Sequence, residues 1–197
     1  MSAYWAFRGF FDFYFRLYNR LEVQGRQYIP GEGGLIVVSN HTSYLDPLVL
    51  GCAVDNRRMT YLAKRELFGI PLVGTFVNSF SVPVDRDRTS HKVIKEIVRH
   101  LCLGEAVAMF PAGERDKDGD GAGAGFKRGL GLLARLSKAK ILPAYIEGTD
   151  RSLPVGGKFP RPSKIRVRFA PPLEAKSNED EIVLMAMENI KGLKVKQ

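Results

Sequence analysis

Cysteine is scarce in this chain, and its placement excludes two common kinds of site. Cys52 and Cys102 are the two cysteines among 197 residues; both lie in apolar stretches and neither belongs to a C-x-x-C motif. This placement argues against a disulfide framework and against a metal site built on thiolates. We therefore predict two buried thiols in a reducing compartment, a cytoplasmic protein, and no bound metal.

The chain also lacks a long hydrophobic run, an internal repeat and a low-complexity tract. A membrane-spanning helix needs about 20 apolar residues with few charges, and the apolar N-terminal segment 4–21 is interrupted by Arg8, Asp12 and Arg16. A secretory signal would have a smoother apolar stretch and a small-residue cleavage site. Because 45% of the 197 residues are hydrophobic, we expect one globular domain with a sizeable core.

Acidic residues are outnumbered by basic ones. The chain has 30 Lys and Arg against 21 Asp and Glu, a formal charge of +9. Such a balance favours an anionic partner, which can be nucleic acid, anionic lipid or a phosphorylated substrate. The sequence has no helix-turn-helix, RNA-binding or zinc-finger pattern. We therefore predict no nucleic-acid partner.

The N-terminal segment 4–21 is rich in aromatic residues and contains the only tryptophan, Trp5. Polar residues recur every four positions from Arg8 to Arg16, so a helix here would have one narrow polar stripe on an aromatic circumference. We predict that residues 1–20 form an amphipathic helix in a membrane interface, with its rings at headgroup depth and its arginines toward phosphate. A helix packed into the core of a soluble domain is the alternative.

Beyond residue 20, strand-like and helix-like patterns alternate along the chain. Short apolar or alternating runs predict strands at 21–28, 35–38, 59–63, 79–86, 106–110, 141–148 and 164–169. Helical spacing predicts helices at 47–53, at 90–103, from 126, and from Ser177, the last with Ile182, Met185, Met187 and Ile190 as its apolar residues. We therefore predict that residues 21–197 form an α/β domain with a mixed, largely parallel sheet flanked by helices.

A histidine and a carboxylate stand five residues apart directly after the apolar run 35–38. An imidazole held by a carboxylate can take a proton from a hydroxyl near neutral pH. On one continuous helix His41 and Asp46 would point about 140° apart, but Asp46-Pro47 is typical of a helix start, and a loop before it can bring the pair together. We predict His41 and Asp46 as a catalytic pair; a helix cap beside an unrelated loop histidine is the alternative.

The block Asn40-His41-Thr42-Ser43-Tyr44-Leu45-Asp46 resembles the signature of the glycerolipid acyltransferases, a family that includes 1-acylglycerol-3-phosphate acyltransferase. Blocks similar to that family follow in the family's order up to about residue 172. The resemblance implies transfer of a fatty acyl group from acyl-CoA or acyl-carrier protein to a lysophospholipid hydroxyl. The expected acceptor is 1-acylglycerol-3-phosphate, which gives phosphatidate. The resemblance implies no cofactor, and it adds Asn40 to the substrate-binding residues.

The block Ser79–Arg86 resembles the family's second block, which ends in an arginine that binds the acceptor phosphate. We expect Arg86 to bind that phosphate, because a planar guanidinium can donate two hydrogen bonds to it. Lys64 is a further candidate for the phosphate. The alternatives are a surface ion pair for Arg86 and a solvated Lys64. Phe80 stands where the family usually has glycine, which alters the backbone path or the pocket width.

The block Phe110–Arg115 resembles the family's third block. Arg115 matches its arginine and is expected to bind phosphate, and Gly113 lets the backbone approach it. Ala112 stands where the family has a glutamate. Glu114 offers a carboxylate two residues later, toward the opposite side of an extended chain.

Two later segments complete the resemblance. Residues 116–127 imitate the start of a calcium loop, but Lys127 stands where a calcium loop has its bidentate glutamate, so we predict no calcium. Lys127 opens a helix instead, where it suits a phosphorylated ligand. The run 141–148 is similar to the family's fourth block, which contributes to binding the acyl donor.

Other functions fit parts of this pattern. A hydrolase would use the same base on water, but the chain lacks a G-x-S-x-G nucleophile elbow. The acceptor can be another lysolipid or glycerol-3-phosphate. A non-catalytic, peripheral lipid-binding module would explain Phe80 and Ala112 but not the retained His41 and Asp46. In each case we expect a peripheral or monotopic protein on the cytoplasmic face of a membrane, with anionic bilayer lipids as partners.

Overall fold

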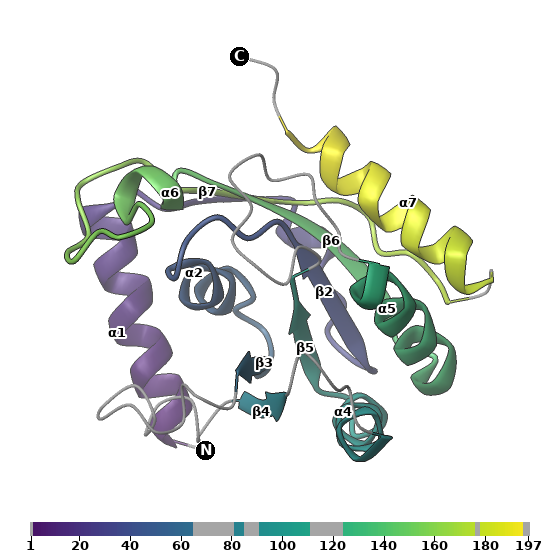
Figure 1. Ribbon diagram of the computed structural model, residues 1–197. Helices are drawn as coiled ribbons and strands as arrows, with labels where there is room; N and C mark the ends of the chain where they lie inside the picture. The colour runs from purple at the N-terminus through teal and green to yellow at the C-terminus, as the bar shows by residue number, and fades with distance from the viewer. Residues whose placement is uncertain (1, 65–80, 85–90, 111–123, 176–177, 195–197) are drawn as a thin grey trace.

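The fold is built on a single sheet. The computed structural model describes residues 2–64, 81–84, 91–110, 124–175 and 178–194 (Figure 1). Its strands are β1 (Glu22–Gln24), β2 (Leu35–Ser39), β3 (Met59–Lys64), β4 (Ser81–Val84), β5 (Ala106–Met109), β6 (Lys140–Glu147) and β7 (Arg166–Phe169). Within the described residues they form a seven-stranded sheet in the order β1-β7-β6-β2-β5-β3-β4.

Most strands of this sheet are parallel. The neighbours from β6 through β2, β5 and β3 to β4 all pair in parallel. The exception is β7, which is antiparallel to β6, and β1 then pairs in parallel with β7. The predicted α/β fold with a mixed, largely parallel sheet is confirmed.

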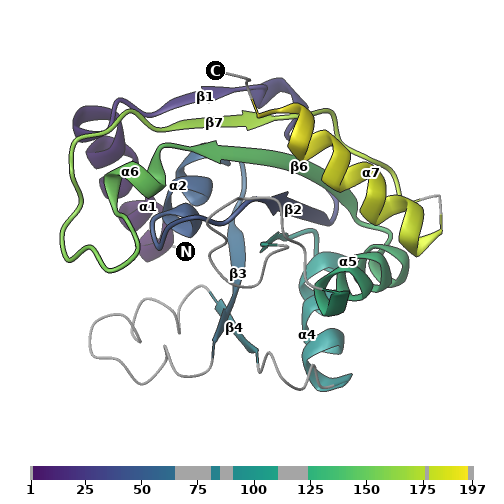
Figure 2. The same ribbon diagram turned by 45° about the horizontal axis from the view of Figure 1, so that its top comes forward.

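Helices cover both faces of the sheet (Figures 1 and 2). They are α1 (Ser2–Tyr18), α2 (Asp46–Ala53), α4 (His91–Cys102), α5 (Ala124–Ser137), α6 (Thr149–Ser152) and α7 (Glu179–Gly192), with a short 3-10 turn at Arg26–Tyr28. One core cluster joins the sheet to α1 and α2, and a second joins it to α4, α5 and α7. The central strand β2 is therefore buried on both faces, which is why it is a continuous apolar run.

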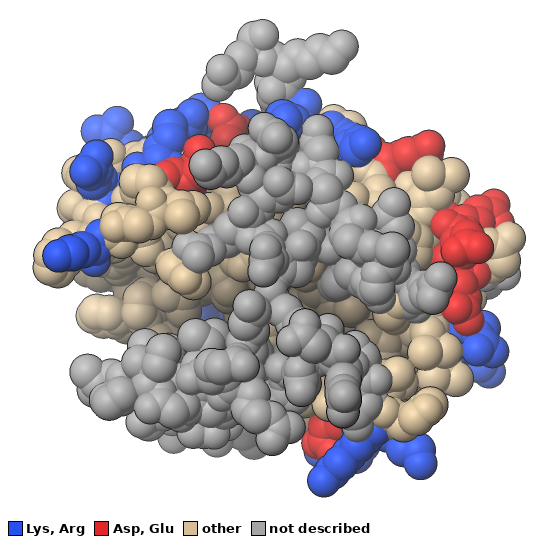
Figure 3. Space-filling view, viewed as in Figure 1, with Lys and Arg blue, Asp and Glu red and all other residues tan. Residues whose placement is uncertain are grey.

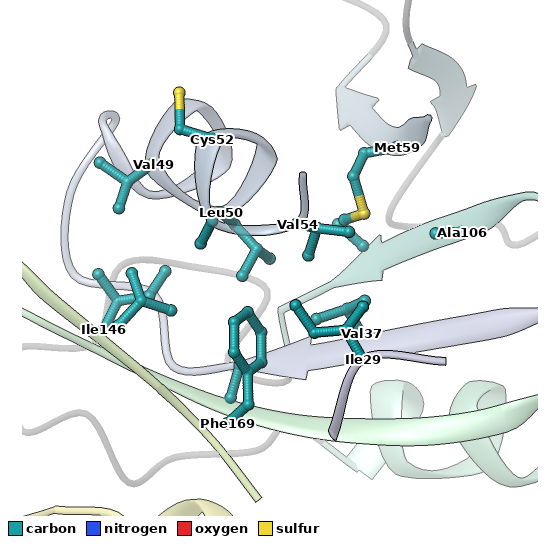
Figure 4. Close-up of a cluster of buried hydrophobic side chains, with 14 of the residues drawn as sticks. Ile29, Val37, Val49, Leu50, Cys52, Val54, Met59, Ala106, Ile146 and Phe169 are labelled. Atoms are coloured by element: carbon teal, nitrogen blue, oxygen red, sulfur yellow. The ribbon is translucent and has the colours of Figure 1, made fainter. Parts of the chain in front are cut away.

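Helix α2 packs closely against the sheet. In Figure 4, Leu50 points toward Phe169 and Val37, whereas Cys52 points to the other side of α2. There the Cys52 thiol lies 3.9 Å from the carbonyl oxygen of Arg8 in α1. Burial raises the pKa of the Cys52 thiol to about 12, so this thiol stays protonated and is no nucleophile.

The contact between α2 and β3 depends on a glycine. A Cβ at Gly51 would lie 2.2 Å from the Tyr61 hydroxyl oxygen and 3.5 Å from the ring carbon that bears it. Because Tyr61 is only 8% exposed, its ring cannot move aside without opening the core. We expect Gly51→Ala to lower the free energy of unfolding by about 1–3 kcal/mol, although alanine favours helix by about 1 kcal/mol.

Tyr61→Phe removes the clashing oxygen and leaves an ordinary carbon contact at 3.5 Å. Gly51→Ala should therefore cost much less in a Tyr61→Phe background than in the wild-type chain. Urea unfolding of the four proteins of this double-mutant cycle measures the difference. An equal cost of Gly51→Ala in both backgrounds would show that the hydroxyl is not the cause.

In the polar stripe of α1, Arg8 and Asn19 face the protein, whereas Arg16 is exposed. The Arg8 guanidinium donates to the carbonyl oxygens of Gly51 at 3.2 Å and Cys52 at 2.8 Å, at the C-terminal end of α2. Asn19, directly after α1, is 0% exposed. The prediction that the arginines point toward phosphate is therefore wrong for Arg8. Its partners are helix C-terminal carbonyls, which attract a cation as a phosphate would.

The opposite face of α1 is apolar and exposed. Phe10, Phe13 and Leu17 are 65%, 68% and 73% exposed, whereas Tyr4 and Phe15 belong to the core. Among the described residues, no helix has both the length and the hydrophobicity to cross a membrane.

Two smaller predictions need correction. Cys102, the last residue of α4, is exposed, so the expectation of two buried thiols holds only for Cys52. In α7 the N-cap is Asn178, whose side chain accepts from the backbone N–H of Glu181 at 2.8 Å. Met185 is 39% exposed rather than buried, because the face turned to the core consists of Ile182, Val183, Ala186 and Ile190.

Candidate active site

The carboxyl ends of three parallel strands bring the site together. His41 follows β2, Phe110 follows β5, and Thr149 follows β6. Because β2 is parallel to both neighbours, these ends lie at the same edge of the sheet. Ligands of α/β proteins commonly bind at this edge.

At its centre, His41 and Asp46 meet across a short loop. His41 Nδ1 lies 2.9 Å from Asp46 Oδ2. The same oxygen accepts hydrogen bonds from the backbone N–H groups of Thr42 at 2.7 Å and Ser43 at 2.8 Å. Among the described residues, nothing donates to Asp46 Oδ1. The carboxylate therefore holds both the loop backbone and the imidazole.

Asp46 is the first residue of α2 rather than its N-cap, which is Leu45. Its side chain turns back over the preceding loop, where it bonds Thr42 and Ser43, which lie before the helix. A role limited to capping the helix does not account for the bond to His41. The loop brings the pair together as the H-x4-D spacing predicted.

The geometry sets the chemistry that this pair can perform. When Nδ1 carries the hydrogen and donates it to Asp46, Nε2 keeps a lone pair that can accept a proton. The Asp46 side chain is 0% exposed and that of His41 is 12% exposed. A buried carboxylate beside a slightly exposed imidazole can stabilise the charged imidazolium, as general base catalysis requires.

An aromatic ring also restrains the imidazole, by packing against its face. The Phe110 ring stacks on His41 with ring centroids 4.5 Å apart and an interplanar angle of 29°. With Asp46 bonded to Nδ1, this stacking restricts rotation of the imidazole about both side-chain torsions. The resemblance included Phe110 only as part of a block, and its contact with His41 was not predicted.

The loop that carries His41 is tied to the end of β6 and to the segment that follows it. Asn40 donates to the carbonyl of Ile146 at 2.8 Å and accepts from its N–H at 2.7 Å. The Ser43 hydroxyl donates to the carbonyl of Leu153 at 2.9 Å. The hydroxyls of Thr42 and Thr149 lie 3.3 Å apart. These bonds hold the loop in one position. The hydroxyls of Thr42 and Ser43, on either side of the His41–Asp46 contact, both have a partner.

The other predicted substrate residues remain predictions. The amide of Asn40 pairs with backbone, and nothing here tests its binding of substrate. Lys64 ends β3 and Lys127 lies in α5, but their side chains lie outside the described residues. Arg86, Gly113, Glu114 and Arg115 also lie outside the described residues.

Thr149 is the residue that sequence reasoning missed most clearly. It is 0% exposed, starts α6, and follows Gly148, whose φ of +92° turns the chain at the end of β6. A Gly-Thr pair directly after a buried strand was a usable signal, because strand ends at this edge supply site residues.

Comparison with known proteins shows which family this chain resembles in sequence. Residues 20–147 match the family model described as Acyltransferase. The 1-acyl-sn-glycerol-3-phosphate acyltransferase of Bacillus subtilis (strain 168) is 30% identical over 129 residues, which are 65% of this chain and 63% of that protein. A chloroplastic 1-acyl-sn-glycerol-3-phosphate acyltransferase of Arabidopsis thaliana is 27% identical over 162 residues, 80% of this chain and 43% of that protein.

A solved structure shares the fold. The crystal structure of the 1-acyl-sn-glycerophosphate acyltransferase of Thermotoga maritima superposes with a TM-score of 0.73 at 22% sequence identity, covering 96% of this chain and 82% of that one. The chain spans about half the length of the curated relatives it matches. Because the family model covers well over half of the sequence, this chain belongs to the acyltransferase family.

Proposed function

We propose that this protein transfers a fatty acyl group from acyl-CoA or acyl-carrier protein to the free hydroxyl of a lysophospholipid. The expected acceptor is 1-acylglycerol-3-phosphate, because the relatives from Bacillus subtilis and Arabidopsis thaliana are named for that substrate. The observation that carries the proposal is the His41–Asp46 pair, joined at 2.9 Å at the carboxyl edge of a parallel sheet.

The reaction follows from this pair without a covalent enzyme intermediate. His41 Nε2 takes the proton of the acceptor hydroxyl as its oxygen attacks the thioester carbonyl carbon. A new C–O ester bond forms and the C–S bond breaks, and the proton passes from His41 to the departing thiolate. Because a thioester is already activated, positioning and base catalysis supply the rate.

The remaining assignments come from the family resemblance. Arg86 and Arg115 bind the acceptor phosphate, Gly113 lets the backbone approach it, and Glu114 offers a carboxylate two residues after the position of the missing family glutamate. Lys64 and Lys127 add positive charge for phosphate groups of either substrate. Each of these assignments stays a prediction.

One experiment separates the possible acceptors. The purified chain is offered a pool of lysolipids and glycerol-3-phosphate with labelled acyl-CoA or acyl-carrier protein, and the products are identified by mass. We expect labelled phosphatidate. Label in another lipid would identify a different acceptor, release of free fatty acid without acyl transfer would indicate a hydrolase, and no turnover with intact lipid binding would favour the non-catalytic alternative.

The outer face of α1 supports attachment to a membrane surface, expected to be the cytoplasmic face. Deleting α1 is a poor test, because Tyr4 and Phe15 would leave the core with it. Replacing Phe10, Phe13 and Leu17 together by serine removes only side chains that are 65–73% exposed. We expect binding to anionic vesicles in a flotation assay to fall at least about tenfold, since each buried apolar side chain contributes about 1 kcal/mol or more.

A matched control tests whether the location of the apolar residues matters. Leu103, Leu136 and Leu184 are 65%, 47% and 59% exposed and lie outside α1. Replacing these three by serine should leave vesicle binding within about twofold of wild type, since single exposed apolar residues are normal on soluble surfaces. Equal losses for both triple variants would show that α1 is not the attachment surface.

A further inference from the structure

The loop 153–163, between α6 and β7, lies beside the end of α1 (Figures 1 and 2). It exposes apolar side chains. Val155 is 57% exposed and Phe159 is 80% exposed. The value for Phe159 is the highest for any large apolar side chain in the described part of the chain. A single exposed phenylalanine is common on protein surfaces, but two exposed apolar side chains in one short loop beside the end of α1 indicate an interaction surface.

Hydrogen bonds fix this loop to the end of α1. The Tyr18 hydroxyl donates to the carbonyl of Pro160 at 3.3 Å. Asn19 Nδ2 donates to the carbonyl of Ser163 at 3.0 Å. At the loop's base, the N–H of Arg161 donates to the carbonyl of Ser152 at 2.7 Å. Phe159 is thereby held on the same side of the molecule as the exposed end of α1.

The charge of the loop indicates the kind of partner. Residues 153–163 include Lys158 and Arg161 and no acidic residue. Both basic residues are exposed, as is Arg20 just after α1. Figure 3 shows Lys and Arg side chains at the upper left of the molecule, where the loop and the end of α1 lie in Figure 1, with some acidic side chains nearby. Aromatic and basic side chains side by side suit the headgroup region of an anionic bilayer.

We propose that the loop 153–163 is a second contact with an anionic bilayer, near the C-terminal end of α1. Phe159 and Val155 enter the interface, and Lys158 and Arg161 bind lipid phosphates. A bilayer accepts separate protruding side chains at headgroup depth, whereas a stable protein interface needs a large complementary area. The loop contact adds to the membrane attachment through α1, and it rests on the proposed function.

The loop also adjoins the candidate active site. The carbonyl of Leu153, its first residue, accepts the Ser43 hydroxyl, and Thr149 in the preceding helix contacts Thr42. Both partners lie in the loop that carries His41. When the loop 153–163 lies on the bilayer, His41 is held near the headgroups, where a lysolipid presents its hydroxyl.

A fluorescent probe in the full chain tests the proposal directly. Trp5→Phe removes the only tryptophan, and Phe159→Trp then places one indole in the loop. With phosphatidylcholine vesicles containing phosphatidylglycerol, we expect its emission to shift to the blue and to be quenched by lipids with brominated acyl chains. The control is Trp5→Phe with Leu184→Trp, on α7, for which we expect neither change. An indole in the loop that stays unshifted while the protein is bound to vesicles would overturn the proposal.

A loss-of-binding measurement complements the probe. Phe159→Ser should weaken binding to these vesicles about tenfold, the equivalent of about 1.4 kcal/mol, and Leu184→Ser should not. Unchanged binding by Phe159→Ser, or a blue shift caused by self-association without lipid, would reject the bilayer as the partner. Acyl transfer by the unmodified chain is measured separately in detergent micelles. Absence of transfer would contradict the proposed function and leave the vesicle result as it stands.

Discussion

Replacing His41 with alanine should lower acyl transfer by about 10²–10⁴-fold, the usual contribution of a general base. Nδ1 of His41 is bonded to a buried carboxylate, and Nε2 is the atom left to accept the hydroxyl proton. The measurement is the initial rate with labelled acyl-CoA and 1-acylglycerol-3-phosphate. Because His41 lies in a loop and is partly exposed, the thermal midpoint should fall by only a few degrees.

The matched control for this variant is His91→Ala. His91 is an exposed histidine at the start of α4, so its loss should leave the rate and the thermal midpoint as in wild type. A His41→Ala protein that keeps more than about a tenth of the wild-type rate would exclude His41 as the general base.

Replacing Asp46 with alanine should damage both activity and stability. The substitution removes the acceptor of two backbone N–H groups, that of buried Ser43 and that of partly buried Thr42, and it frees the imidazole to rotate. An unsatisfied buried donor costs about 1–3 kcal/mol, so we expect the free energy of unfolding to fall by about 2–4 kcal/mol. Urea unfolding and the acyl transfer rate are measured on the same preparation.

Asp46→Asn separates the two roles of the carboxylate. The amide oxygen can still accept from the loop backbone, so stability should recover in part. The negative charge that stabilises the imidazolium is lost, so transfer should remain reduced about 10²-fold or more. Asp150→Asn, which alters an exposed carboxylate in α6, is the control. Wild-type turnover by Asp46→Asn would show that the charge of Asp46 is not needed.

The sequence predicted the parts of the molecule that depend on local pattern. The run Leu35–Val38 has to be a buried strand, because apolar residues without alternation need cover on both faces. The turn before Pro47 follows from the residues that start helices. Together these two features fix the meeting of His41 and Asp46, which is why their pairing was predictable from spacing.

Contacts between distant segments were not predictable in the same way. Periodicity revealed the polar stripe of α1 but not its neighbour, and the carbonyl partners of Arg8 lie more than 40 residues away. For the same reason the stacking of Phe110 on His41 was missed. Cys102 is exposed although its neighbours in sequence are apolar, because neighbours in sequence need not surround a side chain in space.

The pairing of β1 with β7 has a consequence for biosynthesis. Glu22 lies opposite Arg166 in the register of these strands, so the first strand has no sheet to join until 144 more residues have been made. At a translation rate of about 5–20 residues per second, this takes roughly 7–30 s. Throughout that interval β1 has no strand to pair with, whereas the segment that becomes α1 can already pack on α2, whose Gly51 and Cys52 carbonyls accept hydrogen bonds from Arg8.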